Sequence, residues 1–384
     1  MATGLADSNA SPSDEALMPA IPQSTSTQSK MRLQKAACCF GAILIFAFMA
    51  LVLLISLPNK QHHLSITHNF GIGFDLSPSY ATVAVSYPNG SIQPIARVEG
   101  DRAYREMMLR LSLPSSQHLH KPYSNLGDST YDTPRQIWRD TRKKIGLPSS
   151  GDVGTLSNMI YALRARAARH VGEPVSAAAI SIPHLTALYG DDLRDAFEYQ
   201  SLFYLEFFPF SNFRPIPMSI ASYAGNGLGL CEDYRDDAAC AEEELNIPFQ
   251  YALTVGYTRT SLTTSQAHLS RAYYIEETPA LENLRLGYDS RHEESYWEVV
   301  RHMIQSPVVD SPLRRNISMV LLFGDATETQ RFREVLGGVI DGVLGGQVQI
   351  VDQQPEFGAA KGVAELAKRA IFRQGDIQDV SSEL

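Results

Sequence analysis

The chain has 384 residues, of which 44% are hydrophobic and 20% are charged, and its formal net charge is -9. That amount of apolar sequence can bury a sizeable core divided between two lobes. Proteins that bind nucleic acid do so with clustered Lys and Arg, so the acidic balance argues against a nucleic acid partner.

The N-terminal part predicts a tail, a membrane span and a linker. Residues 1–35 are rich in small and polar residues, which indicates a disordered tail. Residues 36–57 carry no charge, and a helix of that length covers roughly 30 Å of hydrocarbon. A buried core helix and a cleaved signal peptide are the alternatives, but the apolar region of a signal peptide is shorter and closer to the start. Residues 58–69 are the linker.

The charges beside the span predict its orientation. Lys30, Arg32 and Lys35 precede it, and only Lys60 follows closely. Because basic flanks stay on the cytosolic side, we expect a cytosolic tail and a C-terminal domain, residues 70–384, in the lumen of the endoplasmic reticulum or a later secretory compartment. The membrane is therefore one predicted partner.

Two features of the translocated part agree with a lumenal location. Asn89 and Asn316 each begin an Asn-x-Ser glycosylation sequence. Cys231 and Cys240 lie nine positions apart and could form a disulfide in an oxidising compartment. Two free buried thiols are the alternative, but the segment between them is too polar for a core.

The first half of the domain reads as strands, then helices, then alternating elements. Alternation and an Asn-Gly turn predict three strands, and longer periodic segments predict helices separated by a polar loop at 115–133. The predicted strands are 70–77, 81–88, 91–100, 174–183 and 213–218, and the predicted helices are 101–111, 133–146, 154–172, 189–208 and 219–229. An acidic loop at 232–244 follows.

The second half repeats the opening pattern. Residues 251–277 again read as strand, small-residue turn, strand and strand. Helices are then predicted at 279–287, 294–305, 328–344 and 358–372, with strands at 316–326 and 347–352. Two halves of this kind predict a duplicated α/β architecture with a cleft between lobes.

Five segments in this order resemble the superfamily of actin, the sugar kinases and the seventy-kilodalton heat-shock chaperone ATPases. They are GFDLSPSYATVAV, AAAISIP, PMSIASYAGNGLG, VLLFGDA and GAAKGVAELA, and the resemblance covers about residues 70 to 373. It implies a duplicated, ribonuclease H-like, two-lobed ATPase fold. It also implies ATP or ADP with Mg²⁺ as a ligand, bound weakly or not at all.

The resemblance assigns nucleotide-site roles to eight residues. Asp75 matches the acid that directs the magnesium ion, which prefers hard oxygen ligands. The residues matching phosphate and adenosine contacts are Ser77, Ser79, Tyr80, Arg259, Thr260, Gly324 and Asp325. For Asp75 a simple turn-capping role is the equal alternative.

Departures from the family pattern argue against ATP hydrolysis. Pro78 stands in the first turn without an N–H, Val255 replaces the second metal-directing acid, and Ile216 stands where the water-orienting glutamate is expected. Phosphoryl transfer depends on positioning and charge neutralisation, which these losses remove. We therefore expect a pseudo-ATPase that acts through weak nucleotide binding or through an unidentified lumenal protein. A lumenal glycosyltransferase and a pure interaction scaffold are the alternatives.

Overall fold

The structure is a computed structural model of the whole chain. It describes residues 66–205, 215–272, 275–277, 279–311, 316–345 and 347–382, together with Met49. The predicted tail, the predicted span and most of the predicted linker lie outside these residues. Within the described part, no helix has the length and apolar character needed to cross a bilayer.

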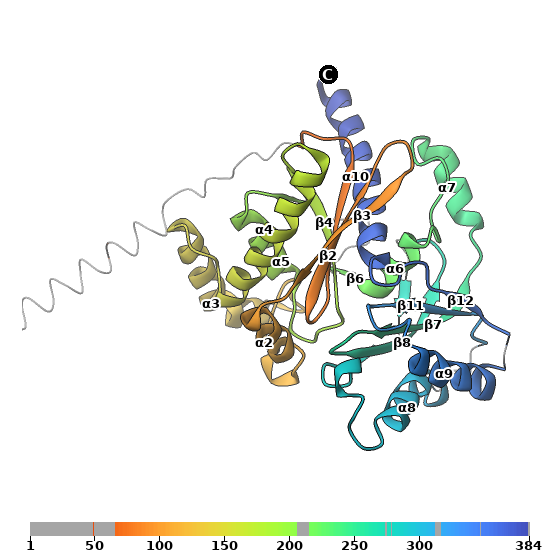
Figure 1. Cartoon of the computed structure of the whole chain (residues 1–384). Helices are drawn as coiled ribbons and strands as arrows, with labels where there is room; N and C mark the ends of the chain where they lie inside the picture. The colour runs from red at the N-terminus through yellow and green to blue at the C-terminus, as the bar shows by residue number, and fades with distance from the viewer. Residues whose placement is uncertain are drawn as a thin grey trace, which may run out of the picture. The chain divides into compact units, whose positions relative to one another are not determined.

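The first sheet contains the N-terminal half of the domain (Figure 1). Its order is β3-β2-β1-β4-β5, and β6 pairs with β4. Its strands are β1 (Gly71–Leu76), β2 (Tyr80–Ser86), β3 (Ile92–Glu99), β4 (Ala177–Ile182), β5 (Phe203–Tyr204) and β6 (Ile216–Pro217). The pairs β1–β2 and β2–β3 are antiparallel, whereas β4 runs parallel to β1.

The second sheet has the same plan. Its order is β10-β8-β7-β11-β12, and β9 pairs with β8. Its strands are β7 (Gln250–Tyr257), β8 (Leu262–Leu269), β9 (Ile275–Glu277), β10 (Leu281–Asn283), β11 (Met319–Phe323) and β12 (Gln349–Val351). Here β7–β8 is antiparallel and β11 is parallel to β7. The predicted α/β class and the repeated strand-turn-strand unit are therefore both present.

Helices cover the outer faces of the sheets and also lie between them. They are α2 (Arg102–Leu111), α3 (Leu126–Lys144), α4 (Gly151–Val171), α5 (Gly190–Tyr199), α6 (Met218–Gly225), α7 (Asp237–Asn246), α8 (Tyr296–Val309), α9 (Gln330–Val339) and α10 (Gly358–Ser382). Apolar clusters join the first sheet to α2, α4 and α5 and the second to α8 and α9. At the centre of the molecule, α6 contacts strands of both sheets, and α10 contacts strands of the first sheet (Figure 1).

Glycines permit the close approach of the central helices. A Cβ atom added to Gly362 of α10 would lie 1.8 Å from the Ala221 carbonyl oxygen of α6. One added to Gly225 of α6 would lie 1.9 Å from the Gly358 carbonyl oxygen. A Cβ atom added to Gly73 of β1 would lie 2.2 Å from the backbone nitrogen of Ala364 in α10. Because strand side chains alternate, Asp75 belongs to this α10-facing side of β1, whereas Phe74 faces the outer core.

Two predicted boundaries in the first half are wrong. The loop at 115–133 is shorter than predicted, because α3 begins at Leu126 and the Asn125 side chain caps it by accepting from the Asp128 N–H. The helix at 189–208 is also shorter: α5 ends at Tyr199, and the chain turns through Ser201 with a φ of 48° before β5.

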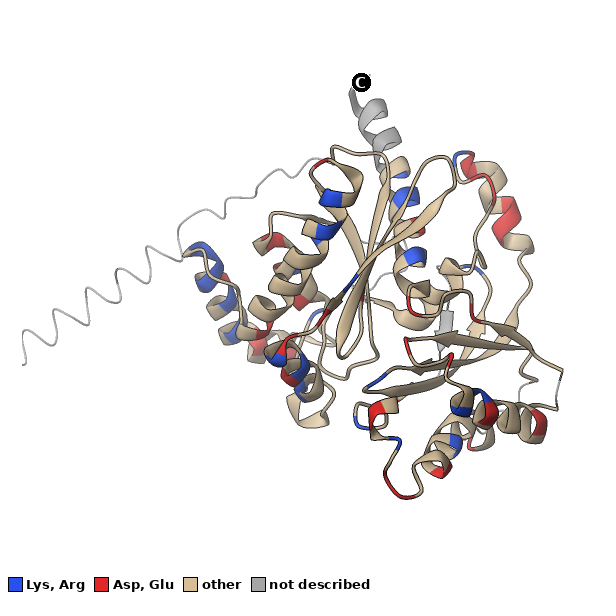
Figure 2. Ribbon diagram, viewed as in Figure 1, with Lys and Arg blue, Asp and Glu red and all other residues tan. Residues whose placement is uncertain are grey.

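Two predictions in the second half are wrong in type. Residues 279–287 form no helix but contain β10, which pairs antiparallel with β8, so a tertiary contact overrides the local preference. The acidic stretch 232–244 is only partly a loop, because α7 begins at Asp237. The Asp236 carboxylate caps this helix by accepting from the N–H groups of Ala238 and Ala239. Figure 2 shows the acidic residues along α7.

Candidate functional site

The predicted nucleotide-site residues come from three strand ends. Asp75 is near the end of β1, and Ser79 is in the turn that follows. Arg259 lies in the turn after β7, and Asp325 follows β11. The structure joins two of these groups, because the Asp325 carboxylate accepts the Arg259 backbone N–H at 3.0 Å. Both residues follow strands of the second sheet.

Asp75 is a buried carboxyl group held by a neighbouring strand. Ser181 of β4 lies beside it in the parallel register, and its hydroxyl donates to Asp75 Oδ1 at 2.7 Å. Burial raises the pKa of Asp75 to about 7, although the bond from Ser181 acts in the opposite direction.

The raised pKa of Asp75 predicts a pH effect on stability. Because the folded pKa lies above the unfolded value of 3.8, this group's stabilising contribution is complete below that value and is lost as pH rises towards 7. Asp75→Asn should remove this loss, making the variant less pH-sensitive than wild type by on the order of 2 kcal/mol between about pH 5 and about pH 8. Urea unfolding of both proteins at the two pH values measures it. Equal changes in both would contradict the raised pKa.

Backbone groups of the turn between β1 and β2 are bonded within the protein, whereas the hydroxyls of Ser77 and Tyr80 are buried without a hydrogen-bond partner among the described residues. The Ser77 N–H donates to the Tyr80 carbonyl oxygen at 2.8 Å. The Tyr104 hydroxyl of α2 donates to the Ser77 carbonyl oxygen, also at 2.8 Å. The Gly100 N–H donates to the Ser79 carbonyl oxygen at 2.8 Å. The side chains of Ser77, Ser79, Tyr80 and Tyr104 are buried. A phosphate group would therefore meet a covered turn.

Arg97 of β3 links the first sheet to the segments after β11 and β12. Its guanidinium donates to the carboxylates of Asp325 at 2.7 Å and Glu356 at 2.8 Å. It also pairs with Glu99 at 2.6 Å and lies 3.9 Å from the centre of the Tyr80 ring. The Asp325 side chain is only 5% exposed. This bridge occupies the place where the resemblance expects magnesium, phosphate and adenosine.

Arg259 and Thr258 of the second turn are also bonded to other groups of the protein. Arg259, which the sequence offers as a phosphate partner, donates to Asp289 through Nε at 3.1 Å and Nη2 at 3.0 Å. The Thr258 hydroxyl accepts from the N–H groups of Thr260 and Ser261 at 3.2 and 2.9 Å. The Thr260 hydroxyl is buried without a hydrogen-bond partner among the described residues.

The residues predicted to contact adenosine contact other parts of the protein instead. Gly324 has a φ of +104°, a conformation that favours glycine, and its N–H donates to the Pro355 carbonyl oxygen at 2.9 Å. The Phe323 ring covers Gly256, where an added Cβ would meet it at 2.2 Å. The ring belongs to the apolar cluster between the sheets. It therefore fills space and does not offer a stacking face.

The sequence analysis missed the residues that close this region. Arg97, Tyr104 and Glu356 belong to none of the segments that carry the resemblance, and Ser181 lies in one of them, AAAISIP, without having been given a role. Arg97 and Asp325 are 228 positions apart, so no local pattern could have joined them. The one available signal was a charged residue in the middle of a predicted strand.

The cysteine pair and the sequons lie away from the strand ends described above. The sulfur atoms of Cys231 and Cys240 are 2.06 Å apart, so the predicted disulfide is present. These cysteines and Glu244 form the one close group of three metal-ligand side chains in the described part of the chain, but bonded sulfur atoms leave it no thiolate ligands. Asn89 and Asn316 are both exposed.

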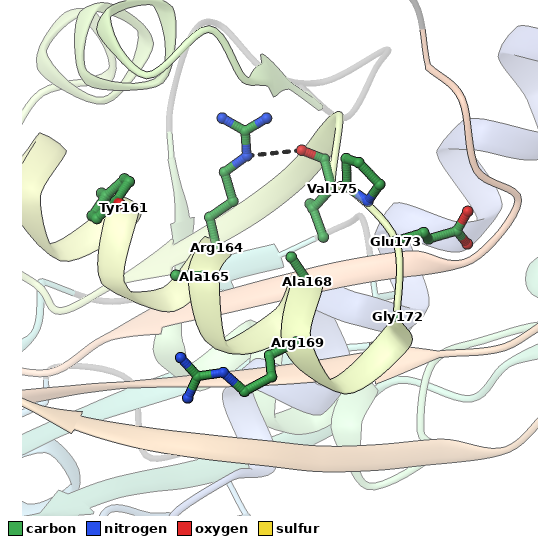
Figure 3. A pocket seen from close by; sticks show the side chains of 9 residues that line it. Tyr161, Arg164, Ala165, Ala168, Arg169, Gly172, Glu173 and Val175 are labelled. Atoms are coloured by element: carbon green, nitrogen blue, oxygen red, sulfur yellow. Dashed lines mark hydrogen bonds between the residues drawn. The ribbon is translucent and has the colours of Figure 1, made fainter.

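A shallow hollow lies on α4 and the segment after it (Figure 3). Its volume is about 590 Å³, and Tyr161, Arg164 and Val175 are among the residues that line it. Arg164 Nε donates to the Val175 carbonyl oxygen at 2.8 Å, so this guanidinium is already bonded to the protein backbone. None of the eight predicted nucleotide-site residues lines this hollow.

No family model matches the chain, and no curated protein matches its sequence.

Proposed function

We propose that the chain is a single-pass membrane protein of the secretory pathway whose lumenal domain is a degenerate actin-like ATPase domain, and that it acts by binding an unidentified lumenal protein. The fold assignment is supported by the shared strand order of the two sheets and by two central helices between them. The observation that carries the loss of ATPase function is the bridge from Arg97 to Asp325 and Glu356.

The bridge disfavours a nucleotide on electrostatic grounds. A nucleotide brings several negative charges and needs cations that are free to meet them. The cation nearest the expected site, Arg97, is already shared among three carboxylates. Binding would require breaking these contacts and leaving Asp325 buried and unpaired, which costs about 3 kcal/mol. Weak nucleotide binding is the second candidate, and it must overcome this cost.

Hydrolysis has less support than binding. Val255 occupies the position opposite Asp75 in the second repeat, and it is fully buried in the apolar cluster of the second sheet. Ile216 of β6 pairs with Ser181 in the first sheet and offers no acid. The glycosyltransferase alternative also lacks its Asp-x-Asp site, because Asp192 is paired with Arg139 and Asp236 caps α7.

The nucleotide test uses the full chain in detergent. Binding to the folded state raises the midpoint of thermal unfolding by mass action. We expect no rise with ATP, ADP and Mg²⁺ and no phosphate release above the buffer rate. A saturable rise would favour the second candidate, and turnover would contradict the pseudo-ATPase proposal.

The same experiment includes a variant of the bridge. Arg97→Ala should lower the free energy of unfolding by about 3 kcal/mol, because it leaves Asp325 buried without its partner. The matched control is Arg102→Ala, whose ion pair with Glu106 is solvent-exposed and contributes little to stability. If the two variants are equally stable, the bridge is not what closes this region.

The membrane topology has its own test. In sealed microsomes, we expect protease to remove the N-terminal tail and to leave the domain that follows residue 57 intact. Glycosidase treatment should increase the gel mobility of the protected fragment, and Asn89→Gln and Asn316→Gln should each remove part of that change. Digestion of the whole domain without detergent would disprove the orientation.

A further inference from the structure

Helix α3 has its charged side chains inside and its apolar side chains outside. Its buried residues are Asp132 and Arg139, and none of its large apolar side chains is buried. This is the reverse of an ordinary surface helix, which buries an apolar stripe and exposes charge. The reversal requires two explanations, one for how the helix is held and one for what its outer face contacts.

Ion pairs hold the inner face of α3 on α5. Arg139 donates to the carboxylates of Asp192 and Asp195, both at 2.6 Å. Lys143 donates to Asp195 and Glu198, both at 3.0 Å. Burial alone would raise the pKa of Asp195, but the two cations hold it below its usual value. The inner face is therefore an ion-pair network of two cations and three carboxylates, which holds α3 on α5 without a large apolar side chain.

The outer face is apolar and exposed. The large side chains on it are Leu126, Tyr131, Ile137, Trp138 and Ile145, with 83% of Tyr131 and 62% of Trp138 exposed. At about 100° per residue, Ile137, Trp138 and Tyr131 fall within an arc of about 120°. Thr130, Pro134 and Thr141 lie between them, and no charged residue does. A continuous exposed apolar surface of this kind marks a site of interaction.

The rim of this face is basic. Arg142 and Lys144 in the last turn of α3 border this face, whereas Lys143 of the same turn belongs to the inner network with α5. The helix has five basic and three acidic residues, in a chain whose net charge is -9, and Figure 2 shows the basic residues along it. Outward Trp, Tyr, Leu and Ile with Lys and Arg beside them is the composition of a helix that lies in a lipid interface.

The length of the chain also favours a lipid surface. The predicted span ends at residue 57, and the described part of the domain begins at residue 66. The eight residues between them reach at most about 28 Å, so the domain cannot leave the neighbourhood of the bilayer that holds the span. A short tether raises the effective concentration of that bilayer at any face of the domain that can contact it.

We propose that the outer face of α3 lies in the interface of the membrane that anchors the chain. This inference rests on the anchor in the proposed function. It explains both features of α3. Ion pairs to α5 hold the helix in place of an apolar core contact, and the lipid surface covers its apolar side chains. A second copy of the chain is the other occupant that such a face could take, and the experiment below separates the two.

The experiment uses the two tryptophans of the chain. In a Trp297→Phe background Trp138 is the only fluorophore of its kind, and Trp297 is a half-exposed residue that packs against Tyr296. The full chain is reconstituted into vesicles of phosphatidylcholine with a minor anionic lipid, with and without lipids brominated near the headgroup end of the acyl chain. We expect loss of Trp138 emission with the brominated lipids and an emission maximum at shorter wavelength than in urea.

Matched variants test whether contact of the outer face with lipid causes the loss of Trp138 emission. Ile137→Glu places a charge beside Trp138 on the exposed face and should restore its emission in brominated vesicles. The control is Tyr161→Glu on α4, which changes a side chain as exposed as that of Trp138 and should leave the loss unchanged. Both positions are exposed, so neither variant removes a core contact.

The outcomes distinguish this inference from the anchor. If the chain floats with the vesicles but Trp138 keeps its emission and is quenched freely by acrylamide, the inference is wrong and the anchor stands. Protection from acrylamide that depends on protein concentration, without quenching by brominated lipid, would identify a second copy and also overturn it. If the chain does not float with the vesicles, the anchor fails, and the inference fails with it.

Discussion

Gly362→Ala is expected to lower the free energy of unfolding by about 4 kcal/mol, because the added methyl group has no space. Its carbon would lie 1.8 Å from the Ala221 carbonyl oxygen and 2.6 Å from the Gly225 nitrogen. Both are backbone atoms of α6, so no side chain can rotate to make room. The two central helices must separate, and α10 also packs on β1 and β4. Urea unfolding of the full chain measures the effect.

The control variant for this prediction should change the free energy of unfolding in the opposite direction. Gly338 lies in α9, it is exposed, and an added Cβ atom would meet nothing within 4 Å. Gly338→Ala should therefore stabilise the protein by about 0.5 to 1 kcal/mol through helix propensity. If Gly362→Ala behaves like Gly338→Ala, the close contact between α6 and α10 is wrong.

Arg139→Ala is expected to cost about 4 kcal/mol, because it leaves two buried carboxylates without their shared cation. Arg139 lies on the inner face of α3, and its side chain is 6% exposed. Asp192 and Asp195 would retain only Lys143 as a nearby cation, and it reaches Asp195 alone. We also expect α3 to lose its fixed position on α5, which faster hydrogen exchange of the α3 amides would show.

Two further variants locate the origin of that cost. Arg331→Ala removes an exposed ion pair with Glu334 and should change the free energy of unfolding very little. Arg139→Met combined with Asp192→Leu and Asp195→Leu should recover much of the lost stability, because replacing a whole buried ion network by apolar groups is often neutral. A triple variant as unstable as Arg139→Ala would mean that the packing of the arginine, and not the unpaired charge, accounts for the loss.

The sequence by itself predicted the α/β class and the repeated strand-turn-strand units. These features rest on local alternation and on turn residues, which the chain carries within each segment. It also predicted the pairing of Cys231 with Cys240, whose short separation makes closure of the loop easy. Local patterns sufficed because the interactions that they describe are themselves local.

Only the tertiary structure decided what the strand ends do. Asp75 was recognised from the sequence, but its raised pKa comes from burial, against which the hydroxyl of Ser181, 106 positions away, acts in the opposite direction. The bridge from Arg97 to Asp325 is equally remote in the chain. Whether a turn is an open phosphate site or a covered one depends on such distant partners, and no motif records them.

The orientation of α3 depended on the same kind of information. Periodicity predicted a helix over 133–146, and the observed helix, Leu126–Lys144, begins earlier and ends two residues sooner. Periodicity separates an apolar face from a charged one but does not say which face is buried, since that depends on the surface opposite. Here the opposite surface is α5, whose Asp192, Asp195 and Glu198 attract the basic face of α3. The attraction between these two helices therefore turned Tyr131 and Trp138 outward.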